Sequence, residues 1–312
     1  MVSMVGPSYQ AEEGVCIPQY ADIEKNLKRL SEFQPRNTDY IFCSYPKSGT
    51  HWVYEIIRML VSGLLNYTAD PIYNLESGNY ADSDGPKESS SPRVLHTHLP
   101  PDMLPKSITE RKMVYILRDP RDQLVSLYHH HQGLKWSPKM SFTDFFKNVQ
   151  DYPEKVEYGN WFRNPYQWWV NYRGRDNVLF VFYEDLINDI HFQITRIAQF
   201  YGLEVTPSLV SQIAKKTKFA EMKYQKPVGD WFSLWHKGSF SIYRNGRIGN
   251  WVDYFTPEMN HAFNEFFKEN TIRGCEYPMR CPLLTDCVSL KQPSPDNSET
   301  IMECQQEVAM AH

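Results

Sequence analysis

The chain has 312 residues, of which 41% are hydrophobic and 22% charged, and its net charge is −4. These proportions are those of a folded globular protein and exclude a disordered chain. The weak negative charge also excludes a protein that binds nucleic acid or an anionic membrane surface through an overall positive field. Because the sequence has no long apolar run and no signal peptide at its start, we expect a soluble, cytoplasmic protein with no membrane and no nucleic-acid partner.

A strand, a glycine turn and a helix are predicted in succession from residue 39 onward. Residues 39–45 form a short aromatic and β-branched run, and the turn 46–49 follows it. From Thr50 apolar residues recur at every third or fourth position, as in a helix. Backbone N–H groups at such a helix start bind anions, and Lys47 adds a positive charge. The turn therefore predicts a phosphate-binding site, although it lacks the Walker spacing of a nucleotide-binding loop.

The later segments alternate between buried strands and helices. Asp119 and Pro120 begin a helix as its N-cap and first helical residue, and Gly202 ends another. The Ser, Gly, Asp and Pro content of 78–92 predicts a loop or lid. The other predicted elements, in chain order, are a short strand at 93–98, a buried strand at 112–117, an aromatic-rich helix at 158–172, a buried strand at 177–183 and a helix at 189–201.

Continuous apolar strands that alternate with helices indicate a parallel sheet with both faces covered. The expected fold class is therefore α/β, with a central parallel sheet flanked by helices. Beyond Gly274 four prolines interrupt a stretch of Ser, Gln, Asp and Glu. We assign residues 1–274 to one domain and expect 275–312 to be a disordered C-terminal tail.

The cysteines and the consecutive histidines do not have the spacing of a metal site. None of the six cysteines belongs to a C-x-x-C pair, so free thiols are expected in a chain without a secretory signal. Histidines that share a helix face are three or four positions apart, whereas His129, His130 and His131 would point in three directions. We therefore expect no metal.

Five segments resemble motifs of the cytosolic sulfotransferases, in the same order along the chain. Their letters are YPKSGTHW at 45–52, HTHLP at 96–100, YILRDPRD at 115–122 with Ser126 beyond it, FYEDL at 182–186 and RNGRIGNW at 244–251. The resemblance spans roughly residues 15–272. It implies a P-loop-like phosphosulfate-binding turn that holds 3′-phosphoadenosine 5′-phosphosulfate (PAPS). The sulfuryl group would pass by in-line displacement to a hydroxyl or amine of a small acceptor.

The same resemblance implies roles for individual residues. His98 would be the general base, a task that suits an imidazole of near-neutral pKa. Lys47 would stabilise the leaving phosphate, as cations do in phosphoryl transfer. His96, Thr97 and His98 would contact the acceptor. The residues that would bind PAPS are Lys47, Ser48, Gly49, Thr50, His51, Trp52, Arg118, Ser126, Tyr183, Thr217, Phe219, Met222, Arg244, Asn245 and Gly246.

Three positions depart from the family pattern: His96 and Asn245 replace lysines, and His51 stands where threonine is common. A histidine at position 96 is expected to add an ionisation between about pH 6 and 8. These changes leave a non-catalytic PAPS-binding homologue as one alternative, against which the retained His98 and Lys47 argue. A small-molecule or nucleotide kinase is the other alternative, and it would need a complete Walker loop.

The acceptor and the oligomeric state depend on more variable segments. The loop 72–92 is expected to form one acceptor wall. Its acids, such as Glu76, are expected to be solvated surface, the alternative being that they face an acceptor with a positive charge. The acceptor could be a phenol, an alcohol, a steroid or an amine. Many relatives pair through K-x-x-x-T-V-x-x-x-E, of which the segment 252–261 keeps only Thr256. We therefore predict a monomer, or a dimer through another surface.

Overall fold

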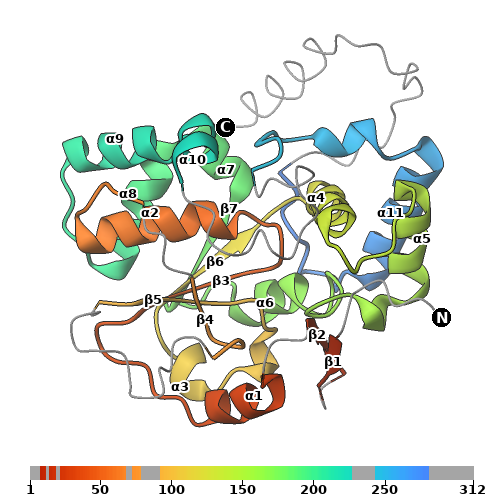
Figure 1. Ribbon diagram of the computed structural model, residues 1–312, viewed down its shortest axis with the longest axis horizontal. Helices are drawn as coiled ribbons and strands as arrows, with labels where there is room; N and C mark the ends of the chain where they lie inside the picture. Colours follow the sequence, from red (N-terminus) through yellow and green to blue (C-terminus); the bar gives the residue numbers. More distant parts are fainter. Residues whose placement is uncertain are drawn as a thin grey trace.

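The computed structural model describes residues 8–11, 14–18, 22–67, 72–78, 92–226 and 243–280, and it is built around one parallel sheet (Figure 1). The strand order is β4-β5-β3-β6-β7, and all neighbouring pairs are parallel. The strands are β3 (Tyr40–Ser44), β4 (Tyr73–Asn74), β5 (Val94–Thr97), β6 (Met113–Leu117) and β7 (Val178–Phe182). The predicted fold class and the positions of β3, β5, β6 and β7 are confirmed, whereas β4 was not predicted, because it lies in the segment expected to be a loop.

The inner strand β6 shows why the apolar runs are continuous. All five of its residues are buried, and successive side chains enter different cores. One core holds α2 (Thr50–Ser62), α8 (Ile190–Tyr201) and α9 (Pro207–Lys216). The other holds α1 (Ile23–Ser31), α3 (Lys106–Thr109), α6 (Pro165–Tyr172) and part of α11 (Pro257–Asn270). Helices therefore cover both faces of the sheet (Figure 1).

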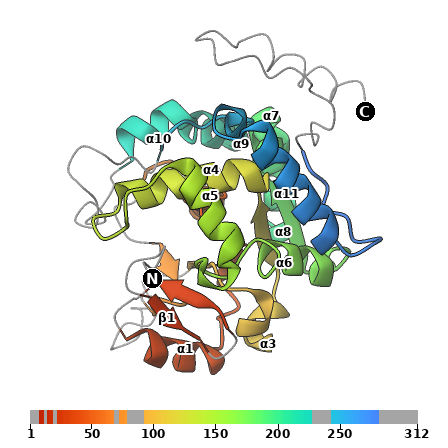
Figure 2. The same cartoon turned by 90° about the vertical axis from the view of Figure 1, so that its right-hand side faces the viewer.

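A third core lies beside the sheet, where α4 (Pro120–Gly133) packs on α5 (Phe142–Asp151), on η5 (Asn250–Asp253) and on α11 (Figure 2). The short strands β1 (Ser8–Gln10) and β2 (Cys16–Pro18) pair antiparallel. The remaining elements are the turns η2 (Pro101–Met103) and η3 (Pro153–Lys155) and the helices α7 (Tyr183–Asn188) and α10 (Phe219–Gln225). None of the helices in the described ranges is long and apolar enough to cross a membrane.

The helix ends show which local signals decided the structure. The Asp119 side chain accepts a hydrogen bond from the N–H of Arg121, and Pro120 is the first helical residue, as predicted. Gly202 ends α8 with φ of 74°, also as predicted. The helix predicted from residue 158 is wrong at its start, because α6 begins only at Pro165. Tyr158 and Gly159 have φ of 61° and 80° and form a turn that a helix cannot include.

The packed chain continues beyond Gly274. Tyr277 is buried, its ring lies 4.7 Å from that of Trp161, and its hydroxyl donates to the Arg118 carbonyl at 3.2 Å. Residues 275–280, which the sequence assigns to the tail, are therefore held on the domain by an aromatic side chain that the composition of the tail obscures. Residues 281–312 and residues 79–91 of the expected lid lie outside the described residues.

Candidate active site

The turn between β3 and α2 forms a cradle of backbone N–H groups. Lys47 and Gly49 have φ of 68° and 105°, and the Ser48 N–H donates to the Tyr45 carbonyl at 3.1 Å. A Cβ on Gly49 would lie 2.9 Å from the Tyr183 ring, so both the backbone and the packing require glycine there. Because α2 has 13 residues and starts at Thr50, its N-terminus presents partial positive charge to this turn.

His98 lies just after β5, at the carboxyl edge of the sheet, and its ring is held in a defined orientation. Its Nδ1 lies 2.6 Å from the Ser44 carbonyl oxygen. Because a carbonyl only accepts, Nδ1 carries the proton and Nε2 carries the lone pair. The ring also packs 5.0 Å from Tyr158. His98 therefore has the tautomer that a base acting through Nε2 requires.

His96 is built into the protein rather than exposed to a ligand. Its side chain is 1% exposed, and its Nε2 lies 2.9 Å from Ser44 Oγ, which in turn lies 2.8 Å from Thr50 Oγ1. Burial, together with His98 and His51, holds the pKa of His96 well below its ordinary value. The expected ionisation of His96 between about pH 6 and 8 is therefore wrong, since a buried imidazole stays neutral there. Thr97 is also buried, and its hydroxyl accepts from the Leu99 N–H.

Cations gather around the turn. Burial lowers the pKa of Lys47 to about 8. Arg118 and Arg244 lower that pKa as well, which places three positive side chains close enough to repel one another. Arg118 Nη1 donates to the Lys47 carbonyl at 2.8 Å, and Arg244 Nη2 donates to Asn250 at 2.6 Å. Neither arginine forms an ion pair with a carboxylate in the described part of the chain, so the cluster has the charge that an anionic ligand would neutralise.

Three buried donors in this region have no hydrogen-bond partner among the described residues: Arg118 Nε, Arg244 Nε and Trp52 Nε1. Unpaired buried donors are rare in folded proteins and need an explanation such as a missing ligand. A molecule with several phosphate or sulfate oxygens and a nucleoside supplies acceptors of this kind. The donor set therefore fits a nucleotide such as PAPS.

Aromatic rings surround the same region. Arg118 lies over the Tyr183 ring at 4.3 Å, and Trp52 meets that ring edge-on at 5.4 Å. The Phe219 ring lies so close to Gly246 that a Cβ there would approach it to 2.4 Å. Thr217 and Met222 are buried beside the start of α10. The structure therefore brings these expected nucleotide-binding positions together. His51 lies in the same region, where burial, Lys226, Lys47 and His98 hold its pKa well below the ordinary value, and Ser126 and Asn245 are half-buried.

Two further residues, both in α4, tie this helix to neighbouring segments, and the motif resemblance gave them no role. Asp122 accepts from the N–H groups of Gly249 and Trp251 at 2.7 and 2.8 Å. Gln123 donates to the Pro46 carbonyl at 2.8 Å. Both lie in or beside the 115–122 motif, so the sequence could predict that they lie near the site. It could not predict which groups they bind.

A model of the sulfotransferase domain matches residues 37–274, which is more than half of the chain. The chain belongs to the sulfotransferase family. Sulfotransferase 1E1 of Homo sapiens is 32% identical to this sulfotransferase over 283 residues, which cover 84% of this chain and 95% of that protein. The 3-alpha-hydroxysteroid sulfotransferase of Cavia porcellus is 31% identical over 276 residues, which cover 82% and 92%. The kinase alternative is therefore wrong.

Solved structures agree with this assignment. Mouse sulfotransferase SULT7A1 complexed with PAP has a TM-score of 0.70 and 26% identity to this sulfotransferase, and the match covers 98% of this chain and 99% of that one. Retinol dehydratase in a complex with retinol and PAP has a TM-score of 0.74 at 23% identity, covers 88% and 93%, and shares the fold. The comparisons thus extend over nearly the whole chain.

The three consecutive histidines of this sulfotransferase serve three different contacts. His129 Nε2 lies 2.7 Å from the Tyr254 hydroxyl, and His130 Nδ1 lies 3.4 Å from Lys47 Nζ. His131 is buried, and its Nε2 lies 3.6 Å from Glu157. The predicted divergence of the three rings is confirmed. No group of three or more potential metal ligands occurs among the residues that the structure describes.

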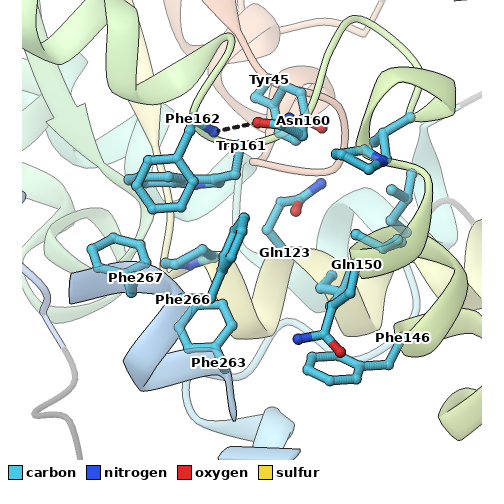
Figure 3. Close-up of a pocket in the computed structure, with 16 residues that line it drawn as sticks. Tyr45, Gln123, Phe146, Gln150, Asn160, Trp161, Phe162, Phe263, Phe266 and Phe267 are labelled. Carbon is cyan, nitrogen blue, oxygen red and sulfur yellow. Dashed lines mark hydrogen bonds between the residues drawn. The ribbon is translucent and has the colours of Figure 1, made fainter. Parts of the chain in front are cut away.

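An apolar pocket lies next to the turn (Figure 3). Gln123, which binds the Pro46 carbonyl, and Tyr45 line its inner wall. The aromatic residues of the other walls come from α5, the turn after η3 and α11: Phe146, Trp161, Phe162, Phe263, Phe266 and Phe267. Neither Lys47 nor His98 lines this pocket, so it is separate from the candidate catalytic groups.

Proposed function

We propose that this protein transfers the sulfuryl group of PAPS to a hydroxyl or amine of a small molecule, with His98 as general base. The observation that carries the proposal is the oriented His98 ring next to a cluster of three cations, Lys47, Arg118 and Arg244. Two relatives support the choice of ligands. SULT7A1 is complexed with PAP, and the guinea-pig relative is named for a hydroxysteroid.

The proposed step follows from this arrangement. The acceptor O–H or N–H bond breaks as its proton passes to His98 Nε2, and the freed electron pair forms the new bond to sulfur. The bond between sulfur and the phosphate oxygen breaks at the same time, and its electron pair leaves on PAP. Lys47 neutralises the charge that develops on that oxygen, which is the main protein contribution in such displacements. His96 is buried and neutral, and its hydrogen bond goes to Ser44.

Incubation of the protein with labelled PAPS and a panel of phenols, alcohols, steroids and amines tests this proposal. We expect labelled sulfate to appear in at least one acceptor class and to require no added metal. A protein that binds PAP tightly but labels no acceptor, while a family member labels its own acceptor in parallel, would instead be the non-catalytic homologue. The cytoplasmic location stays part of the proposal, as does the absence of a metal from the mechanism.

We also propose that the protein is a monomer, or a dimer that uses a surface other than the segment 252–261. Thr256 is the N-cap of α11, and its hydroxyl accepts from the Met259 N–H at 3.2 Å, while Pro257 has no N–H to offer. Both are therefore poorly suited to main-chain pairing with a second chain. We expect sedimentation velocity to give the same mass for wild type and for Thr256→Ala. A tight dimer that Thr256→Ala and Pro257→Val disrupt would contradict this proposal.

A further inference from the structure

Glu76 is a buried carboxylate beside His98. It follows the edge strand β4, which pairs in parallel with β5 and so ends at the same edge of the sheet as His98. Its residue surface is 0% exposed, whereas the sequence suggested a solvated acid. Its Oε1 accepts from the main-chain N–H of His98 and from Asn74 Nδ2, both at 3.0 Å. The carboxylate is therefore tied directly to the main chain of the candidate base.

The second oxygen of this carboxylate, Oε2, is buried without a hydrogen-bond partner among the described residues. Leaving a buried acceptor unpaired is unfavourable, and more so for a charged group. The oxygen of a glutamine could accept the same bond from the His98 N–H without burying a charge. The hydrogen bond alone therefore does not account for a carboxylate here, and the charge itself needs a role.

The charged groups around His98 show where that charge acts. Burial lowers the pKa of His98, and Glu76 opposes that shift more strongly than any other neighbour. The Ser44 carbonyl and Glu157 also raise this pKa, whereas Lys47 lowers it. Among the described residues, the other titratable groups next to His98 are Tyr158, whose ring packs on it, and His51, His96 and His130, whose pKa values burial holds well below the ordinary value. Glu76 is thus the main negative charge that faces the ring.

We propose that Glu76 is a positioning residue for the transfer step, whose carboxylate holds the main chain of His98 and stabilises the imidazolium that forms when His98 takes the acceptor proton. An acidic partner has this effect on the histidine of hydrolase triads, where it favours the protonated ring without taking the proton itself. The inference rests on the proposed function, because the imidazolium matters only if His98 acts as base. It adds a residue from outside all five motifs.

The test is a titration of His98 in the full-length protein by NMR, with ¹³C-labelled histidine. The chain has 10 histidines, and a His98→Asn variant identifies the signal of His98 by its absence. In Glu76→Gln, which keeps an oxygen for the His98 N–H but removes the charge, we expect the pKa of His98 to fall by about one unit. The acid limb of turnover should move by the same amount, with PAP affinity unchanged.

Two variants serve as controls. Glu24→Gln removes a charge from the exposed face of α1 and should leave the titration of His98 unchanged. Glu76→Asp keeps the charge and should keep the pKa close to that of the wild type. An unchanged pKa in folded Glu76→Gln would overturn the inference and leave Glu76 a structural acceptor.

If Glu76→Gln does not fold, the pKa of His98 in Glu76→Asp becomes the test of the inference. A drop of about one unit in a variant that keeps the charge would contradict the inference, and a preserved pKa with preserved turnover would support it. The NMR signal does not depend on activity. A wild type that sulfates nothing would therefore contradict the proposed function while the titration still reported the effect of Glu76.

Discussion

Replacing His98 with alanine is expected to lower turnover by about 10²–10⁴-fold. In the proposed mechanism the oriented Nε2 takes the proton of the acceptor, and alanine leaves no other base at that point. PAP affinity should stay near that of the wild type, because the cations that would bind the phosphates are unchanged. Steady-state assays at saturating PAPS, together with calorimetric titration of PAP, measure the two quantities separately.

The matched control for this prediction is His191→Ala on the exposed face of α8, which should keep full turnover.

The pH profile of turnover follows from the environment of His98. Burial holds the pKa of His98 below its ordinary value, so the proposed base is deprotonated at neutral pH. Turnover should accordingly rise with pH, with the midpoint of the rise below about pH 6.5. A His98→Ala protein that retains most of its turnover, or a wild-type plateau reached only at alkaline pH, would remove His98 from the mechanism.

Adenosine 3′,5′-bisphosphate is expected to bind more than 100-fold more tightly than adenosine 5′-monophosphate, a difference of roughly 3 kcal/mol. The 3′-phosphate would pair with Arg118, Arg244 and Ser126, and charge-assisted bonds of this kind are among the strongest that a side chain makes. Arg244→Gln should lose most of this preference while binding the monophosphate as before. Calorimetry that gave similar affinities for both nucleotides would refute the donor assignment.

The nucleotide titrations need a control variant, and the PAP affinity that they measure is expected to depend on pH. Arg273→Gln, an exposed arginine after α11, should bind both nucleotides like the wild type. The pKa of Lys47 is about 8 in the free protein, and only the protonated ammonium attracts an anion. PAP affinity should therefore fall as the pH rises through about 8. Lys47→Arg, which stays charged, should not show this fall, and an alkaline loss that persists in it would assign the ionisation to another group.

The sheet and the cradle could be predicted from the sequence because their signals are local. Strands buried on both faces must be continuously apolar, as in β6, and a helix after a glycine turn places its N–H groups at one point. The carboxyl ends of parallel strands also meet at one edge, which brings the segments after β3, β5 and β6 together. These expectations needed no knowledge of distant contacts.

The remaining features depend on packing between distant segments. The sequence predicts that an acid in a polar loop is exposed. Glu76 is buried because the preceding strand β4 pairs with β5. The substitution at His96 suggested a titrating group, but the direction of its pKa shift depends first on burial, to which Phe42 of the neighbouring strand β3 contributes. Likewise Tyr277 lies in a proline-rich stretch whose composition predicts disorder, although its ring is buried. In each case the deciding partner lies far away in the sequence.

Helix α4 fixes the distance between the turn 46–49 and the segment that carries Arg244. Near its start Gln123 binds the carbonyl of the turn that would hold the 5′-phosphosulfate, and Asp122, its neighbour, binds the segment that carries Arg244. Two adjacent residues of one helix thus fix how far apart these two segments lie. If the segments bind the two phosphates as proposed, the site selects the length of its ligand as well as its charge. A nucleotide with both phosphates but a longer sugar linkage should therefore be rejected even though every charged partner is present.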